Sequence, residues 1–129
     1  MATLLASGCA PSSEPRPCAN VDPTLASSSF IVVSSPLPGE RVTSPVRITG
    51  CSRTHESNVV WELRGRDGSV LGSGFTTGGG VDGPAPFEAS AELFVTAEEV
   101  AELDVYMPDE SEGEGFPPPR TVFQVVLAP

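Results

Sequence analysis

The chain has few of the residues on which common binding and catalytic sites are built. Its 129 residues include no lysine, one histidine and one tryptophan, and only 6% are aromatic. Seven arginines against 17 acidic residues leave a net charge of −10 at pH 7. A surface of this sign repels phosphate backbones, so nucleic acid is not an expected partner. The few aromatic residues also weaken the case for a carbohydrate-binding surface.

Long apolar segments are missing as well. No run approaches the roughly 20 apolar residues that a membrane-spanning helix requires, and the length suits one domain with a short tail. Glycine and proline are frequent, with 13 and 14 residues, yet 39% of the chain is hydrophobic. This composition is too apolar for a wholly disordered chain and favours a turn-rich β domain.

The motifs of common enzymes are also lacking. His55 is the single histidine, and no G-x-S-x-G sequence supplies a nucleophile for it. The glycines 78–80 are not followed by Lys-Ser or Lys-Thr, which excludes a phosphate-binding P-loop. We therefore expect no catalytic residues, no enzymatic activity and no cofactor.

From Phe30 onward, short apolar segments alternate with turns about every 8 to 12 residues. This spacing predicts an all-β fold, an immunoglobulin-like antiparallel β-sandwich of seven or eight strands over residues 30–129. Val59, Trp61 and Leu63 alternate with Val60, Glu62 and Arg64. Asp67-Gly68 predicts a two-residue type I′ hairpin after them. Residues 96–101 are expected to form one helical turn. The predicted core contains Val32, Val46, Ile48, Trp61, Leu63, Phe87, Leu93, Val105 and Val125.

Residues 1–29 differ from this domain. The sequence MATLLASGC resembles a truncated bacterial lipobox, in which Cys9 would carry a diacylglycerol after cleavage before it. It lacks the basic residues and the full apolar run of about 7 to 15 residues typical of a secretory signal, so an ordinary cysteine is the alternative. Residues 10–29 are rich in Pro, Ser and Ala and read as a flexible tether. The resemblance implies an extracytoplasmic, membrane-anchored lipoprotein.

The other two cysteines, Cys18 and Cys51, suit a disulfide in an exported protein. Such a bond would join the tether to the domain, and two free thiols are the alternative. A structural zinc site is not favoured, because the three cysteines and His55 are widely spaced and form no C-x-x-C pair.

One acidic segment is a weak candidate for a metal site. Carboxylates gather between residues 108 and 119, where hard cations such as calcium would find several oxygen ligands: Asp109, Glu110, Glu112 and Glu114. The spacing is not that of an EF-hand, and a solvated acidic loop is the alternative.

Residues 35–50, SPLPGERVTSPVRITG, carry a family resemblance. They are similar to the start of the immunoglobulin-like domain of bacterial sporulation and spore germination proteins (the Gmad group), with its S-P-x-P-G and S-P steps and a strand ending in glycine. Two departures are His55, where an aromatic residue is usual, and Cys51 directly after Gly50. The resemblance implies a non-catalytic extracytoplasmic binding or scaffolding module of the cell envelope.

Two kinds of binding function follow. In the first, a sheet face or edge strand holds another envelope protein, and an exposed apolar patch or unpaired edge near the last strand would favour it. In the second, the Gly-rich residues 77–86 and the acidic loop form a rim for a cation or glycan, and clustered carboxylates would favour it. The sequence does not specify the oligomeric state.

Overall fold

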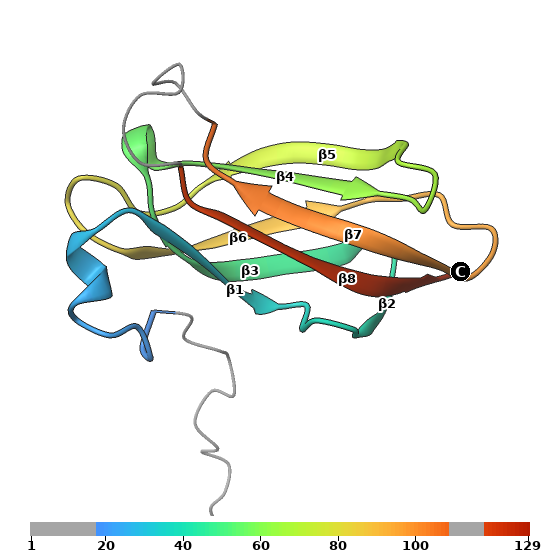
Figure 1. Ribbon diagram of the computed structural model, residues 1–129, viewed down its shortest axis with the longest axis horizontal. Coiled ribbons are helices and arrows are strands. Elements are labelled where there is room, and N and C mark those ends of the chain that lie inside the picture. The colour runs from blue at the N-terminus through green and yellow to red at the C-terminus, as the bar shows by residue number, and fades with distance from the viewer. Residues whose placement is uncertain (1–17, 109–117) are drawn as a thin grey trace, which may run out of the picture.

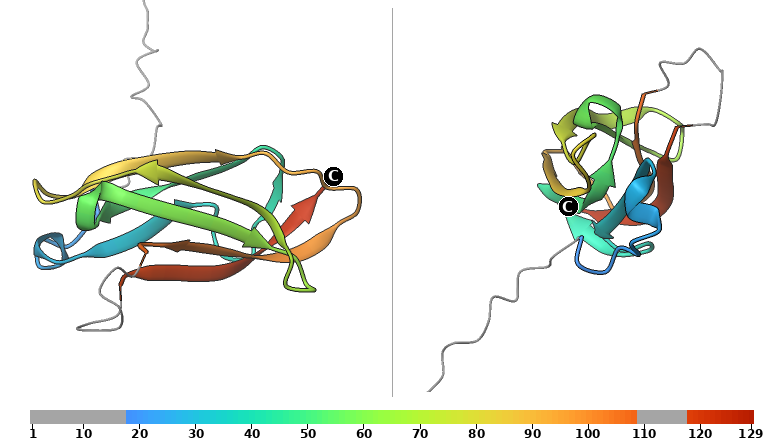
Figure 2. Two further views of the ribbon diagram at one scale, coloured as in Figure 1. Left: turned by 90° about the horizontal axis from the view of Figure 1, so that it is seen from above. Right: turned by 90° about the vertical axis from the view of Figure 1, so that its left-hand side faces the viewer.

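The computed structural model describes residues 18–108 and 118–129, and in this part of the chain eight strands form two facing sheets (Figures 1 and 2). The predicted all-β sandwich is confirmed. The smaller sheet has the order β1-β3-β6 and the larger sheet the order β2-β8-β7-β4-β5. The strands are β1 (Phe30–Ser35), β2 (Arg41–Thr43), β3 (Val46–Arg53), β4 (Asn58–Arg64), β5 (Val70–Thr77), β6 (Ala85–Ala91), β7 (Glu99–Tyr106) and β8 (Arg120–Ala128).

All pairs are antiparallel except β2 with β8, which run parallel. Two short 3-10 helices, η1 (Leu25–Ser27) and η2 (His55–Ser57), precede β1 and β4. Two peptide bonds in the motif region, Ser35-Pro36 and Ser44-Pro45, are cis.

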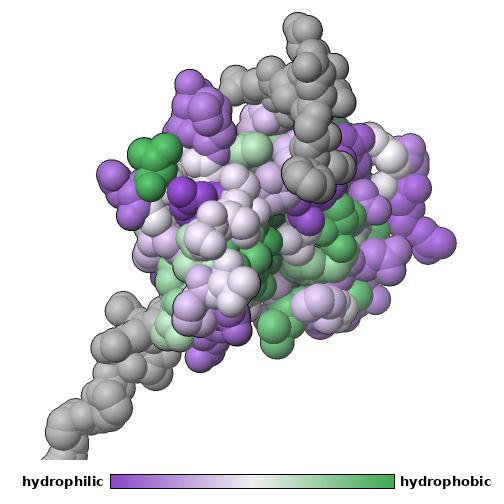
Figure 3. All heavy atoms as spheres, turned by 60° about the vertical axis from the view of Figure 1, so that its left-hand side comes forward, coloured by the Kyte–Doolittle hydropathy of each residue, from purple (hydrophilic) through white to green (hydrophobic). Residues whose placement is uncertain are grey.

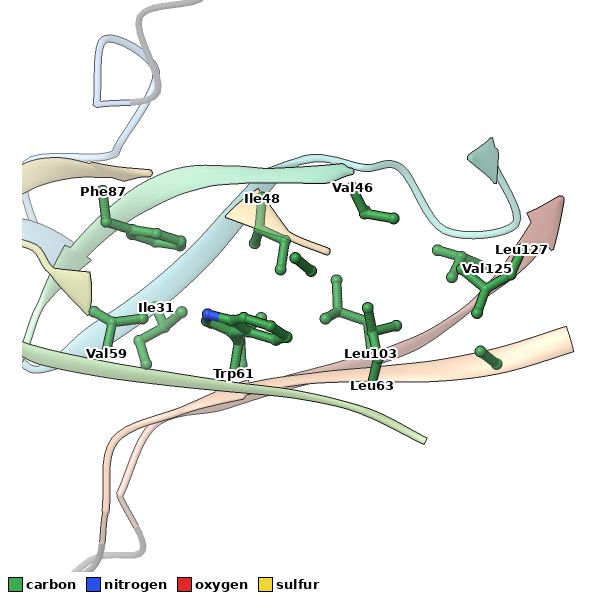
Figure 4. Close-up of a cluster of buried hydrophobic side chains, with 13 residues drawn as sticks. Ile31, Val46, Ile48, Val59, Trp61, Leu63, Phe87, Leu103, Val125 and Leu127 are labelled. Atoms are coloured by element: carbon green, nitrogen blue, oxygen red, sulfur yellow. The ribbon is translucent and has the colours of Figure 1, made fainter. Parts of the chain in front are cut away.

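The core lies between the sheets and is built from every second residue of the strands (Figure 4). On β4 the buried residues Val59, Trp61 and Leu63 alternate with half-buried neighbours, as a strand with one face on the core requires. Of the predicted core, Leu93 is partly buried and packs against the cluster. The members that are fully enclosed are Val46, Ile48, Trp61, Leu63, Phe87, Val105 and Val125.

Val32 was predicted to be in the core and is not, because 39% of it is exposed. Ile31, one position earlier, is the residue of β1 that enters the core. A shift of one residue reverses the face to which a strand side chain points. Since Ile31, Val32 and Val33 are all β-branched and apolar, the sequence itself carries no alternation that sets this phase.

The β4–β5 turn also differs from the predicted type I′ hairpin. The N–H of Gly68 donates to the carbonyl of Gly65 at 3.0 Å, and that of Gly65 donates to Ser69 at 2.9 Å. Gly68 has φ +86°, whereas Asp67 has no positive φ, as a type I′ turn would demand. The loop between the paired residues Gly65 and Ser69 therefore has three residues instead of two, and the Asp67 carboxylate accepts the Ser69 N–H at 2.9 Å.

The helical turn expected at residues 96–101 is absent from the described chain. Residues 96 and 97 form a bend, and β7 begins at Glu99. Pairing with β8, which starts at Glu99↔Leu127, satisfies the backbone that a single helical turn would leave unpaired.

Two glycines on β5, Gly72 and Gly74, leave room for the indole of Trp61. In the β4–β5 register Trp61 lies opposite Gly74. A Cβ at Gly74 would lie 2.9 Å from Cζ2 and 3.0 Å from Nε1 of the indole, and one at Gly72 would lie 2.7 Å from Leu93. Gly50 plays the same part for Phe87, because a Cβ there would lie 2.5 Å from the ring.

We predict that Gly74→Val lowers the free energy of unfolding by about 1 to 3 kcal/mol, because the new side chain overlaps the indole of Trp61. Urea unfolding followed by tryptophan fluorescence measures this loss. Ser73→Val is the matched control, since Ser73 is exposed on the same strand, and it should change stability by less than about 0.5 kcal/mol. A Gly74→Val protein as stable as the parent would contradict this account of the core.

Candidate partner-binding surface

The outer faces of the two sheets differ in how far they are covered by other parts of the chain. Cys51 faces away from the core on β3, and a disulfide joins it to Cys18, with the two Cα atoms 5.1 Å apart. Cys51 and Phe30 are buried although both lie on the outer side of the three-stranded sheet, and the disulfide holds Cys18 against Cys51 there. This cross-link spans 33 residues and stabilises the fold by about 3 to 4 kcal/mol in the chain-entropy model.

The outer face of the five-stranded sheet is open. The strand register places outward residues of β4, β7 and β8 side by side in rows. One row holds Glu62, Asp104 and Val122. The neighbouring row holds Val60, Tyr106 and Arg120, and β5 extends it to Phe75. We refer to these seven residues together with Arg64 as the outer-face patch.

Polar side chains of the outer-face patch form one connected series. Arg64 pairs with Oε1 of Glu62, and Oε2 of Glu62 accepts the Tyr106 hydroxyl at 2.9 Å. The Arg120 guanidinium lies 4.8 Å from the centre of the Tyr106 ring, within range of a cation–π interaction. The Nε–H group of Arg120 donates to Oδ1 of Asp104 at 3.1 Å. These contacts hold the four side chains in one arrangement.

Asp104 is the buried member of this series, with 6% exposed. Burial raises the pKa of Asp104 above 3.8, and Arg120 offsets only part of that increase. Burial also raises the pKa of Tyr106, and its hydrogen bond to the Glu62 carboxylate adds to the effect. At neutral pH the phenol therefore stays protonated and donates.

Apolar side chains flank the polar series. Phe75 is 78% exposed at the edge strand β5, and Val122 is 45% exposed on β8. Val60 lies half-buried between them. An exposed apolar patch near the last strand is the feature expected for a protein partner, and these three side chains are the apolar members of the outer-face patch.

The Gly-rich loop is occupied by internal contacts. The N–H groups of Gly78 and Gly79 donate to Ser57 and Ser52 at 2.9 and 3.2 Å, and that of Gly80 donates to Gly83 at 3.2 Å. A Cβ at Gly79 would lie 2.4 Å from three backbone atoms. These glycines serve close packing against the β3–β4 connection, and their donors are used within the protein. Figure 3 shows apolar surface on this side only as separate patches divided by polar surface.

The sites expected from sequence are distributed as follows. Cys9 and the acidic candidates Asp109, Glu110, Glu112 and Glu114 lie outside the described residues. His55 is exposed, with Nε2 3.9 Å from Glu56. Among residues 18–108 and 118–129, no group of three or more His, Cys, Asp or Glu side chains is arranged to hold a metal ion.

Sequence reasoning did not find the outer-face patch. Its members stand at the polar positions of alternating strands, such as Glu62 and Arg64 on β4. That alternation marks a solvent-facing side but does not say which strands become neighbours. The order β8-β7-β4-β5 brings together residues up to 60 positions apart, and only the register reveals their contacts.

This architecture is that of an immunoglobulin-like β-sandwich domain. The chain belongs to the family described as the immunoglobulin-like domain of bacterial spore germination, whose model matches residues 30–114. The match includes the S-P-x-P-G segment and ends within the acidic stretch of the sequence between residues 108 and 119.

Among solved structures, the crystal structure of CopC from Methylosinus trichosporium OB3b is similar, with a TM-score of 0.49 and 17% sequence identity. The similarity covers 79% of this chain and 95% of that one. No curated protein sequence matches this chain. In the part of the chain that the structure describes, no helix is long and apolar enough to cross a membrane.

We predict that Asp104→Asn raises the free energy of unfolding relative to the parent protein, and that this gain is larger at pH 7 than at pH 3. The folded pKa of Asp104 is raised above 3.8, so its favourable contribution is complete below that pH and is lost as the pH rises through the folded pKa. Asparagine carries no charge to desolvate, and we expect a gain of at most about 1 kcal/mol at pH 7.

Urea unfolding at both pH values measures this difference, and Asp67→Asn is the control of opposite sign. Hydrogen bonds from Ser69 lower the pKa of Asp67, so its contribution is present at pH 7 and is lost on acidification. The Asp67→Asn protein should therefore lose stability at pH 7 relative to pH 3. The same sign for both variants would contradict the assignment for Asp104.

Proposed function

We propose that the chain is a non-catalytic, extracytoplasmic binding or scaffolding module of the bacterial cell envelope. It holds another envelope protein against the outer-face patch of its five-stranded sheet. Membership of the spore germination immunoglobulin-like family supports the class of function. The Cys18–Cys51 disulfide supports an oxidising compartment.

The choice of surface rests on one observation, which is the difference in exposure between the outer faces of the two sheets. The disulfide holds Cys18 against Cys51 on one outer face, where Val32 is 39% exposed, whereas Phe75 and Val122 are 78% and 45% exposed on the other. Side chains that are already paired, such as Tyr106 with Glu62, lose little conformational entropy when a partner binds. Apolar residues around them supply the area that binding removes from water.

Photocrosslinking in the native envelope tests this surface. With p-benzoylphenylalanine at position 122, we expect one dominant crosslinked envelope protein, and far less from position 90, which is exposed on β6 of the opposite sheet. Phe75→Ser, which removes the largest exposed apolar side chain of the patch, should weaken the crosslink from position 122 at least about fivefold. Equal crosslinking from both positions, or no effect of Phe75→Ser, would reject the outer-face patch as the binding surface.

We further propose that Cys9 anchors the module to the membrane through a diacylglycerol. In a host that expresses the gene with its upstream region, intact mass of the membrane fraction should fit cleavage before Cys9 plus the lipid. Cys9→Ala should move the protein to the soluble fraction, and Cys18→Ala, the control, should leave it at the membrane. An unmodified Cys9 in the soluble fraction would remove the anchor from the proposal.

A further inference from the structure

Strand β5 forms one border of the five-stranded sheet (Figure 1). On one side it pairs with β4, without interruption from Gly72 to Thr77. We refer to its other side as the β5 edge, with which no described strand pairs. Thr76 makes a contact toward β6, but its hydroxyl and not its main chain donates to the Glu88 carbonyl, at 2.8 Å. Since alternate N–H and C=O groups of an edge strand point away from its neighbour, a row of main-chain groups is open along β5.

The other edges of the two described sheets carry protecting features that β5 lacks. Short strands, bulges, prolines and charges are what keep sheet edges from pairing with further strands. The strand β2 spans only Arg41–Thr43, and the register of β1 is irregular between Val33 and Ser35. The strand β6 contains Pro86 and Glu88. By contrast, β5 is eight residues long, with the sequence VLGSGFTT, and has neither a charge nor a proline.

The side chains of β5 indicate what an added strand would carry. Ser73, Phe75 and Thr77 are exposed and alternate with half-buried residues, so they share the outward face of the sheet. An added strand would place every second side chain on that face. A β-branched residue beside an aromatic one is a favourable cross-strand pair, and an uncharged row fits the uncharged β5. The β5 edge therefore suits an extended segment with apolar β-branched residues at alternate positions.

Charge and position decide between two sources of such a segment. The chain has a net charge of −10, so two copies of it repel each other. Phe75 belongs both to β5 and to the outer-face patch, so the edge and the patch form one continuous surface. A protein held against the outer-face patch thus has the β5 edge within reach. These two observations favour the partner over a second copy of this chain.

We propose that the envelope partner supplies an extended, uncharged segment that pairs with β5 as an additional strand of the five-stranded sheet. Main-chain hydrogen bonds hold the segment, and its β-branched side chains pack beside Phe75. The identity of the partner as an envelope protein rests on the proposed function, whereas the pairing itself depends only on the β5 edge.

Two synthetic peptides test the pairing by NMR titration of the ¹⁵N-labelled full chain. The probe is acetyl-Gln-Thr-Val-Thr-Val-Thr-Gln amide, and the control is the same peptide N-methylated at its three central residues. We expect the probe to shift the amides of residues 70–77 and to slow hydrogen exchange at alternate amides of β5, those that do not donate to β4. The control should bind at least about tenfold more weakly, because it lacks the main-chain donors that face β5.

The variant Val122→Ser separates this pairing from the proposed function. Val122 lies on β8, which is not a neighbour of β5, so the change should leave the affinity for the probe unaltered. Loss of the envelope crosslink from position 122 with intact probe binding would reject the outer-face patch alone.

Three results would overturn the pairing with β5. They are equal affinity for the two peptides, amide shifts that spare residues 70–77, and slow exchange at every β5 amide of the chain without peptide. A dimer of this chain that forms through β5, detected by analytical ultracentrifugation and the same amide shifts, would overturn the assignment of the β5 edge to a partner.

Discussion

The indole of Trp61 lies against β5 at the two positions where that strand carries no side chain. A Cβ on Gly74 would be 2.9 Å from the ring, so the strand approaches the core only because glycine stands there. This close approach keeps β5 paired along β4 and sets the width of the five-stranded sheet. It also holds Phe75, the next residue, on the outer side and exposed. The outer-face patch therefore lies on the solvent-facing side of the same strands whose inward residues form the core.

The disulfide gives the two sheets different roles. Cys51 lies on the central strand of the three-stranded sheet, so the segment that begins at Cys18 is fixed to the middle of that sheet and not to its edge. Its outer face is then partly covered and buries Phe30. The five-stranded sheet has no such covering among the described residues, and its outward side chains stabilise one another through contacts such as Arg120 with Asp104.

The fold class and most of the core could be predicted because alternation is a local signal. The polar residues Glu62 and Arg64 alternate with Trp61 and Leu63 on β4, so the sequence shows which face of this strand is buried. The phase of Val32 was wrong because three β-branched residues in a row have no alternation. The start of β7 at Glu99 depends on pairing with β8, which outweighs local capping preferences. The β4–β5 turn is local, but an Asp-Gly pair also fits a three-residue loop with Gly68 at positive φ, so its length was not fixed by that pair. The outer-face patch requires the strand order itself, which no local pattern contains.

The placement of the outer-face patch follows from where residues 18–29 are fixed to the sandwich. Residues 18–29 enter at the end that carries the Gly-rich loop, and its glycine N–H groups are used against Ser52 and Ser57. That end has little left to offer a ligand among the described residues. The outer-face patch lies on the other sheet from the one to which the disulfide fixes this segment. If the chain before Cys18 leads to the membrane, a partner can reach the outer-face patch without displacing the disulfide-linked segment.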